Sequence, residues 1–224
     1  MQAIDRSVAL PYWRFDQPSP GIFTKAFLGE SAPSGNVQFT PGHPLEFWKT
    51  DGVTGIVRTP LFNTSLATGV RTEAATLLLG TVYSAFRTME GNPHGSAHTS
   101  FDVDSFISDI PTAARDPLFF LLHCNVDRLW AKWQVNNARL DIATAASFQS
   151  STPPNRIGHN LPDTMWPWNG VIVPPRPPFA PGGALAASPC ATAPGPSPRV
   201  QDCFDYQGSL NPANRMGFSY DDIP

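Results

Sequence analysis

The residues best suited to chemistry in this sequence are its five histidines. His94 and His98 are four residues apart, and on a helix this spacing places both rings on one face, one turn apart. Two imidazoles arranged in this way can bind one metal ion. His123, on a strongly apolar segment, is the third candidate ligand. A set of imidazoles without a nearby carboxylate or thiolate favours copper or zinc.

The same spacing also fits a purely structural interpretation. His94 and His98 would then face solvent at the start of a helix, and His123 would be a hydrogen-bonded histidine of the core. His43 and His159 lie in loops without ligand spacing, so we expect both of them to be surface or capping residues.

Three helices must position these side chains. Apolar residues at spacings of three and four predict an amphipathic helix from Thr72 to Met89. A capping residue followed by proline is typical of a helix start, so Asn92-Pro93 predicts a short second helix and Asp116-Pro117 a third. The third extends to about Val135 and should be central to the core. Residues 11–67 are interrupted by prolines and should contain little regular structure.

Composition narrows the possible partners and folds. A net charge of -3 with 15% charged residues provides no dense basic surface, so we expect neither a nucleic acid nor a membrane as partner. The 25 prolines exclude a simple helical bundle. Many of them lie between Pro153 and Pro198, which predicts a domain over 1–150 followed by an extended proline-rich segment over 151–224. Cys190 and Cys203 are compatible with a disulfide or with two thiols.

Four segments, in this order along the chain, resemble conserved segments of the tyrosinase and polyphenol oxidase family. Leu10 to Asp16 (LPYWRFD) is similar to its PYW segment, and Glu90 to His98 (EGNPHGSAH) to its first copper-B segment. Asp116 to Trp133 (DPLFFLLHCNVDRLWAKW) closely resembles the helix that carries the third copper-B ligand. Phe218-Ser-Tyr220 looks like the aromatic-x-Tyr motif that closes the catalytic domain.

The resemblance implies roles for individual residues. His94, His98 and His123 would be the copper-B ligands, with Asp127 behind them at the end of the H-x-x-x-D pattern. Glu90 matches the catalytic glutamate that orients a water able to receive the proton of a phenol.

The resemblance also marks departures from the family. Gly95 occupies a substrate-binding position where strongly monophenol-hydroxylating members often have asparagine, so o-diphenols are the expected substrates and monophenols less favoured ones. Leu122 replaces an additional, non-ligating histidine of many members. Phe119 and Phe120 are expected to be core residues at the copper-facing end of the helix, and Cys124 a buried thiol that binds no metal.

The implied fold is mainly α, part of a tyrosinase-type four-helix bundle with long, irregular, proline-rich loops. The implied reaction is the oxidation of o-diphenols to o-quinones by dioxygen at two copper ions. Because the copper-A and copper-B sites together need six histidines and the sequence has five, we expect a C-terminal part of a longer enzyme, weakly active or inactive alone.

Two other functions stay open, a non-catalytic mononuclear metal-binding protein and a haemocyanin-like oxygen-binding module. If the copper-A helices are missing, the helix face with Leu121, His123 and Asp127 should border an exposed apolar surface. Such a surface predicts self-association.

Overall fold

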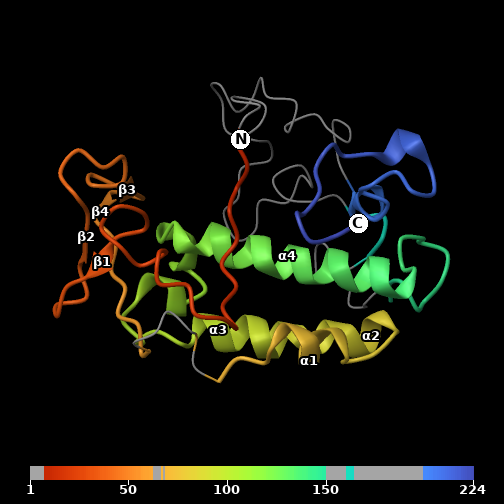
Figure 1. Ribbon diagram of the computed structural model, residues 1–224, viewed down its shortest axis with the longest axis horizontal. Helices are drawn as coiled ribbons and strands as arrows, with labels where there is room; N and C mark the ends of the chain where they lie inside the picture. The colour runs from red at the N-terminus through yellow and green to blue at the C-terminus, as the bar shows by residue number, and fades with distance from the viewer. Residues whose placement is uncertain (1–7, 63–66, 68, 150–159, 164–198) are drawn as a thin grey trace. The chain divides into compact units, whose positions relative to one another are not determined.

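The computed structural model describes residues 8–62, 67, 69–149, 160–163 and 199–224 (Figure 1). The chain divides into two compact units. One comprises Leu10–Leu79 and Phe86–Trp130, and the other comprises Met1–Ala9, Gly80–Ala85 and Ala131–Pro224. The domain boundary expected at residue 150 falls outside the described residues and stays a prediction.

Most of the regular structure in the described residues is helical, and a four-helix bundle is not confirmed there. The helices are α1 (Glu73–Leu77), α2 (Tyr83–Phe86), α3 (Ser96–His98) and α4 (Leu118–Asn137). Short 3-10 or π-type turns are η1 (Arg87–Glu90), η2 (Gly91–Gly95), η3 (Phe106–Ser108), η4 (Ala113–Arg115), η7 (Val200–Cys203) and η8 (Pro212–Asn214).

The helix predicted from Thr72 to Met89 is interrupted, so this prediction is wrong in its continuity. Thr72 caps α1, but the helix ends at Leu77, and Gly80 has a positive φ of 151°. A Cβ on Gly80 would lie 2.7 Å from that of Ala85, so glycine suits this break. Leu78, which the periodicity placed on the apolar face, is 84% exposed as a result.

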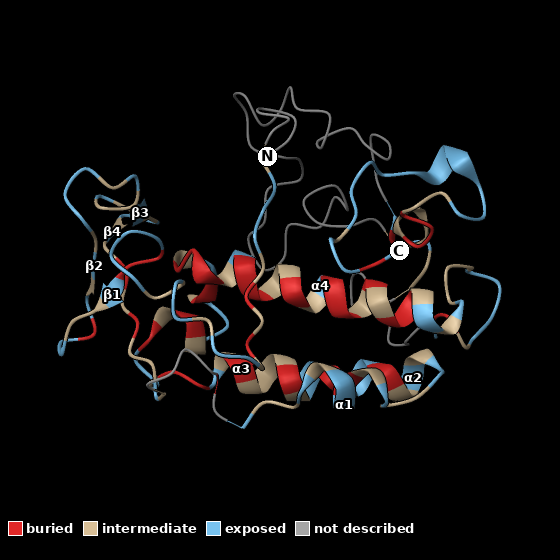
Figure 2. Ribbon diagram, viewed as in Figure 1, coloured by how far each residue is buried: buried red, intermediate tan, exposed pale blue. Residues whose placement is uncertain are grey.

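The third predicted helix is confirmed as α4, the longest in the described residues. Asp116 accepts a hydrogen bond from the backbone N–H of Leu118 at 2.9 Å, which is the expected capping contact. Buried residues recur along the whole helix (Figure 2), including Leu118, Leu122, Leu129 and Trp133.

The described residues between 11 and 67 form mainly turns, as expected. Their regular structure consists of two short antiparallel hairpins, β1 (Glu30–Ser31) with β2 (Val37–Gln38) and β3 (Lys49–Thr50) with β4 (Val53–Thr54). In register, Glu30 pairs with Gln38 and Lys49 with Thr54.

The segment Leu10 to Asp16 contacts both α1 and the first half of α4. Trp13 is fully buried, and its backbone N–H donates to the carbonyl of Leu121 in α4 at 3.0 Å. Asp16 accepts from the N–H of Glu73, the first residue of α1, at 2.7 Å. The Glu73 carboxylate in turn binds Arg14 at 3.0 Å and Arg128 of α4 at 2.8 Å.

The other unit has a small apolar cluster of its own. Ala131, Tyr206 and Ile223 are buried there, and Tyr220 packs against them. Phe218 stacks on Tyr206 with ring centroids 5.2 Å apart. Both aromatic residues of the Phe218-Ser-Tyr220 motif therefore contribute to packing in this unit.

Among the described residues, no helix is long and apolar enough to cross a membrane.

Candidate metal centre

His94 and His98 lie on a short helical segment made of η2 and α3. The segment is brief, as predicted, and the extended backbone of Asn92 (φ -149°, ψ 118°) suits a capping position, but the Asn92 side chain does not bond the N–H groups of the segment. The Asn92 side chain instead accepts from the N–H of Arg71 at 2.6 Å and donates to the carbonyl of Gly69 at 3.1 Å. Asn92 thus ties the start of this segment to the preceding loop.

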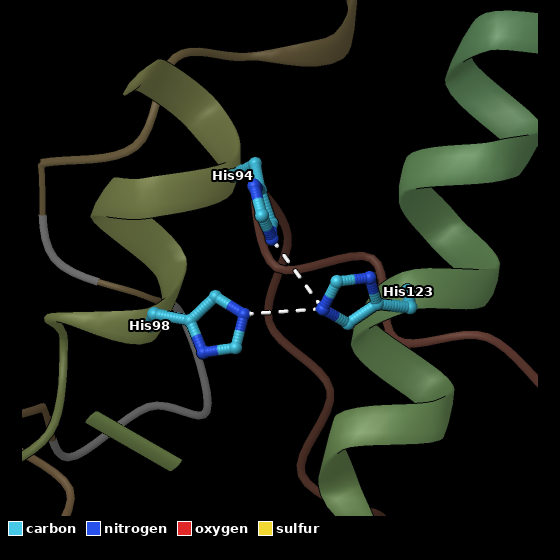
Figure 3. Close-up of side chains that lie close together, drawn as sticks. All are labelled: His94, His98 and His123. Carbon is cyan, nitrogen blue, oxygen red and sulfur yellow. Dashed lines mark hydrogen bonds between the residues drawn. The ribbon is translucent and has the colours of Figure 1, made fainter. Parts of the chain in front are cut away.

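His123 lies on α4, in the same compact unit as the other two histidines. Figure 3 shows His94 and His98 projecting toward His123 from the opposite segment. The Nε2 atom of His123 lies 3.4 Å from Nε2 of His94 and 3.3 Å from Nε2 of His98. The convergence expected from the sequence is therefore confirmed, and all three ligand atoms lie within 4.8 Å of one another.

The two separations from His123 are suitable for ligands of one metal ion. Nitrogens bound at about 2.0–2.1 Å and at tetrahedral angles are about 3.3–3.4 Å apart. Each ring presents an Nε2 atom, and no carboxylate or thiolate joins the group of three in the described part of the chain. Such an all-imidazole donor set suits copper or zinc.

A neighbouring carbonyl fixes the tautomer of His98, and a carboxylate lies close to His94. The Nδ1 atom of His98 lies 2.6 Å from the backbone carbonyl of Ile107. Because a carbonyl can only accept, Nδ1 of His98 carries the proton and Nε2 keeps its lone pair. Nδ1 of His94 lies 3.1 Å from Oε1 of Glu90, at ion-pair distance, although the ring N–H is not aligned for a good hydrogen bond.

The electrostatics of the site favour neutral imidazoles. Burial, together with smaller contributions from the charges of His94 and His98, lowers the pKa of His123 to about 4. Burial also lowers the pKa of His98, although the bond to Ile107 opposes this shift. The contact with His94 lowers the pKa of Glu90, so this carboxylate is ionised at neutral pH. Unprotonated rings are the form that binds metal.

The two phenylalanines before His123 have different surroundings. Phe119 packs on His123 with ring centroids 4.1 Å apart and also approaches His98, at 6.3 Å. Phe120, in contrast, is 45% exposed, so its predicted place in the core is wrong. Leu122, at the position of the family's extra histidine, is fully buried.

Cys124 and Asp127 stand apart from the three-histidine group. Cys124 is partly buried, and its pKa is raised to about 11 by burial and by the negative charge of Asp127. Asp127 itself is exposed. Leu121, which was expected to border an open apolar surface, is itself buried. Self-association through this helix face is not tested and stays a prediction.

His43 is not part of the three-histidine group. His43 stacks on Phe39 at 4.8 Å, and its Nδ1 accepts from the N–H of Leu45 at 3.1 Å, which agrees with the predicted capping role. His159 and Cys190 lie outside the described residues, so neither the role of His159 nor the pairing of Cys190 with Cys203 is tested.

Comparison with known proteins places this site in a family. Residues 58–136, which include all three histidines, match the family model described as the common central domain of tyrosinase. The chain is 28% identical to a tyrosinase of Streptomyces lincolnensis, over 75% of this chain and 67% of that protein. It is also 28% identical to the chloroplastic polyphenol oxidase A1 of Vicia faba, over 58% of this chain and 25% of that protein.

These matches support membership of the tyrosinase and polyphenol oxidase family for the region that carries the site. A further relative is the chloroplastic (+)-larreatricin hydroxylase of Larrea tridentata, 28% identical over 61% of this chain. The matched regions span about a quarter of the length of these plant relatives. Members of this family are type 3 copper proteins, so copper is the cofactor, and His94, His98 and His123 form its candidate site.

Sequence motifs missed two features of this site. The carbonyl of Ile107 gives no sequence signal, because any residue has one, and it reaches His98 only through the fold. The pairing of Phe119 with His123 could have been found, since these residues are four apart on a predicted helix. Gly95 is partly buried beside His94 in sequence, with helical backbone.

Proposed function

We propose that this chain provides the copper-B half of an oxidoreductase that oxidises o-diphenols to o-quinones with dioxygen. The observation that carries the proposal is the convergence of three Nε2 atoms, from His94, His98 and His123, in a family of copper proteins. Copper, when bound, would supply one-electron exchange between Cu(I) and Cu(II). In the balanced reaction, two o-diphenols give four electrons and four protons to one dioxygen, yielding two o-quinones and two waters.

The histidines would hold the metal in a largely apolar environment. Leu118 and Leu122 on α4 are fully buried, and Phe119 covers one side of the His123 ring. Packing of this kind limits the access of water to the ligands. Asp127 is exposed and is not one of the three grouped ligands, so it would act from behind them.

Glu90 would orient a water near an incoming phenol. Its side chain is 76% exposed, so substrate and solvent can reach it, and its lowered pKa makes it a hydrogen-bond acceptor rather than a strong base. Glu90→Gln should keep the bound copper, because an amide oxygen can still face Nδ1 of His94. The same variant should form o-quinone more slowly.

Gly95 would make o-diphenols better substrates than monophenols. Glycine has no side chain to hold the same water as Glu90. Gly95→Asn should raise the ratio of monophenol to o-diphenol turnover, and a Cβ there would lie 3.3 Å from the carbonyl oxygen of Glu90, a tight but adjustable contact.

We further propose that this chain alone is weakly active or inactive. A pair of copper ions bound by imidazoles needs six histidines, and this sequence has five. His43 already has structural contacts away from the group. The full rate would then need a protein that adds a second copper site.

Copper binding and quinone formation test the proposal together. After loading with Cu(II) and dialysis, we expect one copper per chain, lost in His98→Ala and kept in His43→Gln. With catechol in air, the loaded chain should form o-quinone slowly, above a free-copper blank, and His98→Ala should not. Failure to retain copper, or retention of two ions, would contradict the proposed site.

The second candidate is a non-catalytic mononuclear metal-binding protein. It is favoured by the single three-histidine group in the described residues. One bound copper per chain without any copper-dependent o-quinone, even when an added protein supplies the second copper site, would support this candidate and overturn the proposed reaction.

A further inference from the structure

The turn that supports His98 is held at several points. η3 supplies the Ile107 carbonyl, which lies 2.6 Å from Nδ1 of His98. The backbone N–H of Phe106, in the same turn, donates to the carbonyl of Val57 at 3.0 Å. Ser105 accepts from the N–H of Thr59 at 2.9 Å through its hydroxyl. The turn is therefore attached to the irregular segment that precedes the site.

Ser108 connects this turn to the end of α3. Its hydroxyl lies 2.9 Å from the carbonyl of Asp102, 3.2 Å from that of Phe101 and 3.4 Å from that of His98 itself. A hydroxyl has one proton, so the bond to Asp102 should dominate and the other two contacts are weaker. These contacts link Ser108, next to Ile107, with the backbone of the candidate ligand and the residues that follow it.

From this arrangement we infer that Ser108 is a positioning residue for His98. By holding the 106–108 turn against residues 98–102, it keeps the Ile107 carbonyl on Nδ1 of His98. The bound carbonyl selects the tautomer with the proton on Nδ1, and Nε2 of His98 then faces His123 with its lone pair free. This inference rests on the proposed metal site, and it adds a residue that touches no metal.

Thr112 provides a matched control in the same loop. Its hydroxyl also donates to backbone carbonyls, those of Phe106 at 3.0 Å and Asp109 at 3.3 Å. These bonds stay within the loop and do not reach residues 98–102. Thr112→Val removes a hydroxyl of the same kind with almost no change in volume.

Two measurements on the full chain test the inference, and neither depends on activity. The first is the dissociation constant for Cu(II), obtained by competition with a chelator. Ser108→Ala should weaken binding about tenfold, as substitutions behind metal ligands commonly do. Ser108→Thr, which keeps the hydroxyl, should restore most of the affinity, and Thr112→Val should bind as wild type does.

The second measurement is the tautomer of His98 in the metal-free protein, from the nitrogen chemical shifts of the ring. Wild type and Thr112→Val should carry the proton on Nδ1, and Ser108→Ala should show a mixture of tautomers. A merely structural role would lower stability without this change.

The outcomes separate this inference from the proposed function. If wild type retains no copper, the proposed function fails. If wild type binds copper and Ser108→Ala matches it in affinity and tautomer, only the role of Ser108 is overturned. If Ser108→Ala does not fold, the tautomer of His98 in the wild-type protein tests the inference instead. A proton on Nε2 of His98 would then overturn it.

Discussion

Arg58 and Asp116 form a fully buried ion pair at the start of α4, with two hydrogen bonds of 2.6 and 2.7 Å. The same carboxylate caps α4 through the N–H of Leu118. Arg58 also donates to the carbonyl of Leu28 at 2.9 Å. One carboxylate therefore both starts the helix that carries His123 and anchors it to residues far away in sequence.

Removing Arg58 should destabilise the fold strongly. Arg58→Met would leave the Asp116 carboxylate buried without its partner, which costs about 3–5 kcal/mol. The free energy of unfolding in urea measures this loss. Lys132→Ala is the control, because its 2.8 Å pair with Asp222 is partly exposed and should contribute about 1 kcal/mol or less. Similar losses of unfolding free energy in the two variants would show that the buried pair stabilises the fold no more than the partly exposed pair does.

Phe119 should matter for metal affinity while its neighbour should not. Phe119→Leu removes the packing on His123, worth about 1 kcal/mol, so copper should bind about fivefold more weakly. Phe120→Leu is matched in chemistry but changes an exposed ring, and it should leave affinity unchanged. Chelator competition gives both constants. Equal copper affinities for the two variants would show that Phe119 has no role in metal binding beyond packing in the core.

Acid should destabilise the metal-free protein through its partly buried histidines. In the unfolded chain a histidine has a pKa of about 6.5, whereas that of His123 in the fold is about 4. Between these values the unfolded state binds more protons, so stability falls as the pH falls from about 6.5 toward 4. The lowered pKa of His98 acts in the same direction.

Urea unfolding of the metal-free chain at pH 7 and pH 5 measures this dependence. His123→Gln should flatten the pH dependence, because one partly buried titrating group is gone, and His43→Gln should leave the slope as in wild type. A slope that His123→Gln does not change would contradict the low pKa of His123.

Cys124 should be unreactive and unnecessary for metal binding. With its pKa raised to about 11, the thiol carries almost no thiolate at pH 8, so alkylation by iodoacetamide should be slow. Mass spectrometry of tryptic peptides gives the rate. Cys124→Ala should retain copper as wild type does. Loss of copper in this variant would make the thiol a ligand and refute its interpretation as structural.

The sequence alone determined those parts of the site that depend on local periodicity. The spacing of His94 and His98 and the capping signal at Asp116 depend on the geometry of one helical segment, so both could be predicted. The long apolar segment around His123 likewise predicted α4, because helix periodicity is a property of neighbouring residues.

Tertiary structure decided the rest. The helix predicted from Thr72 to Met89 breaks at Gly80, where Trp133, distant in sequence, donates to the Gly80 carbonyl at 2.7 Å. The tautomer of His98 depends on the carbonyl of Ile107, and the anchoring of α4 depends on Arg58. These contacts join residues that only folding brings together. Neither a backbone carbonyl nor a buried arginine has a periodic sequence pattern from which its partner could be predicted.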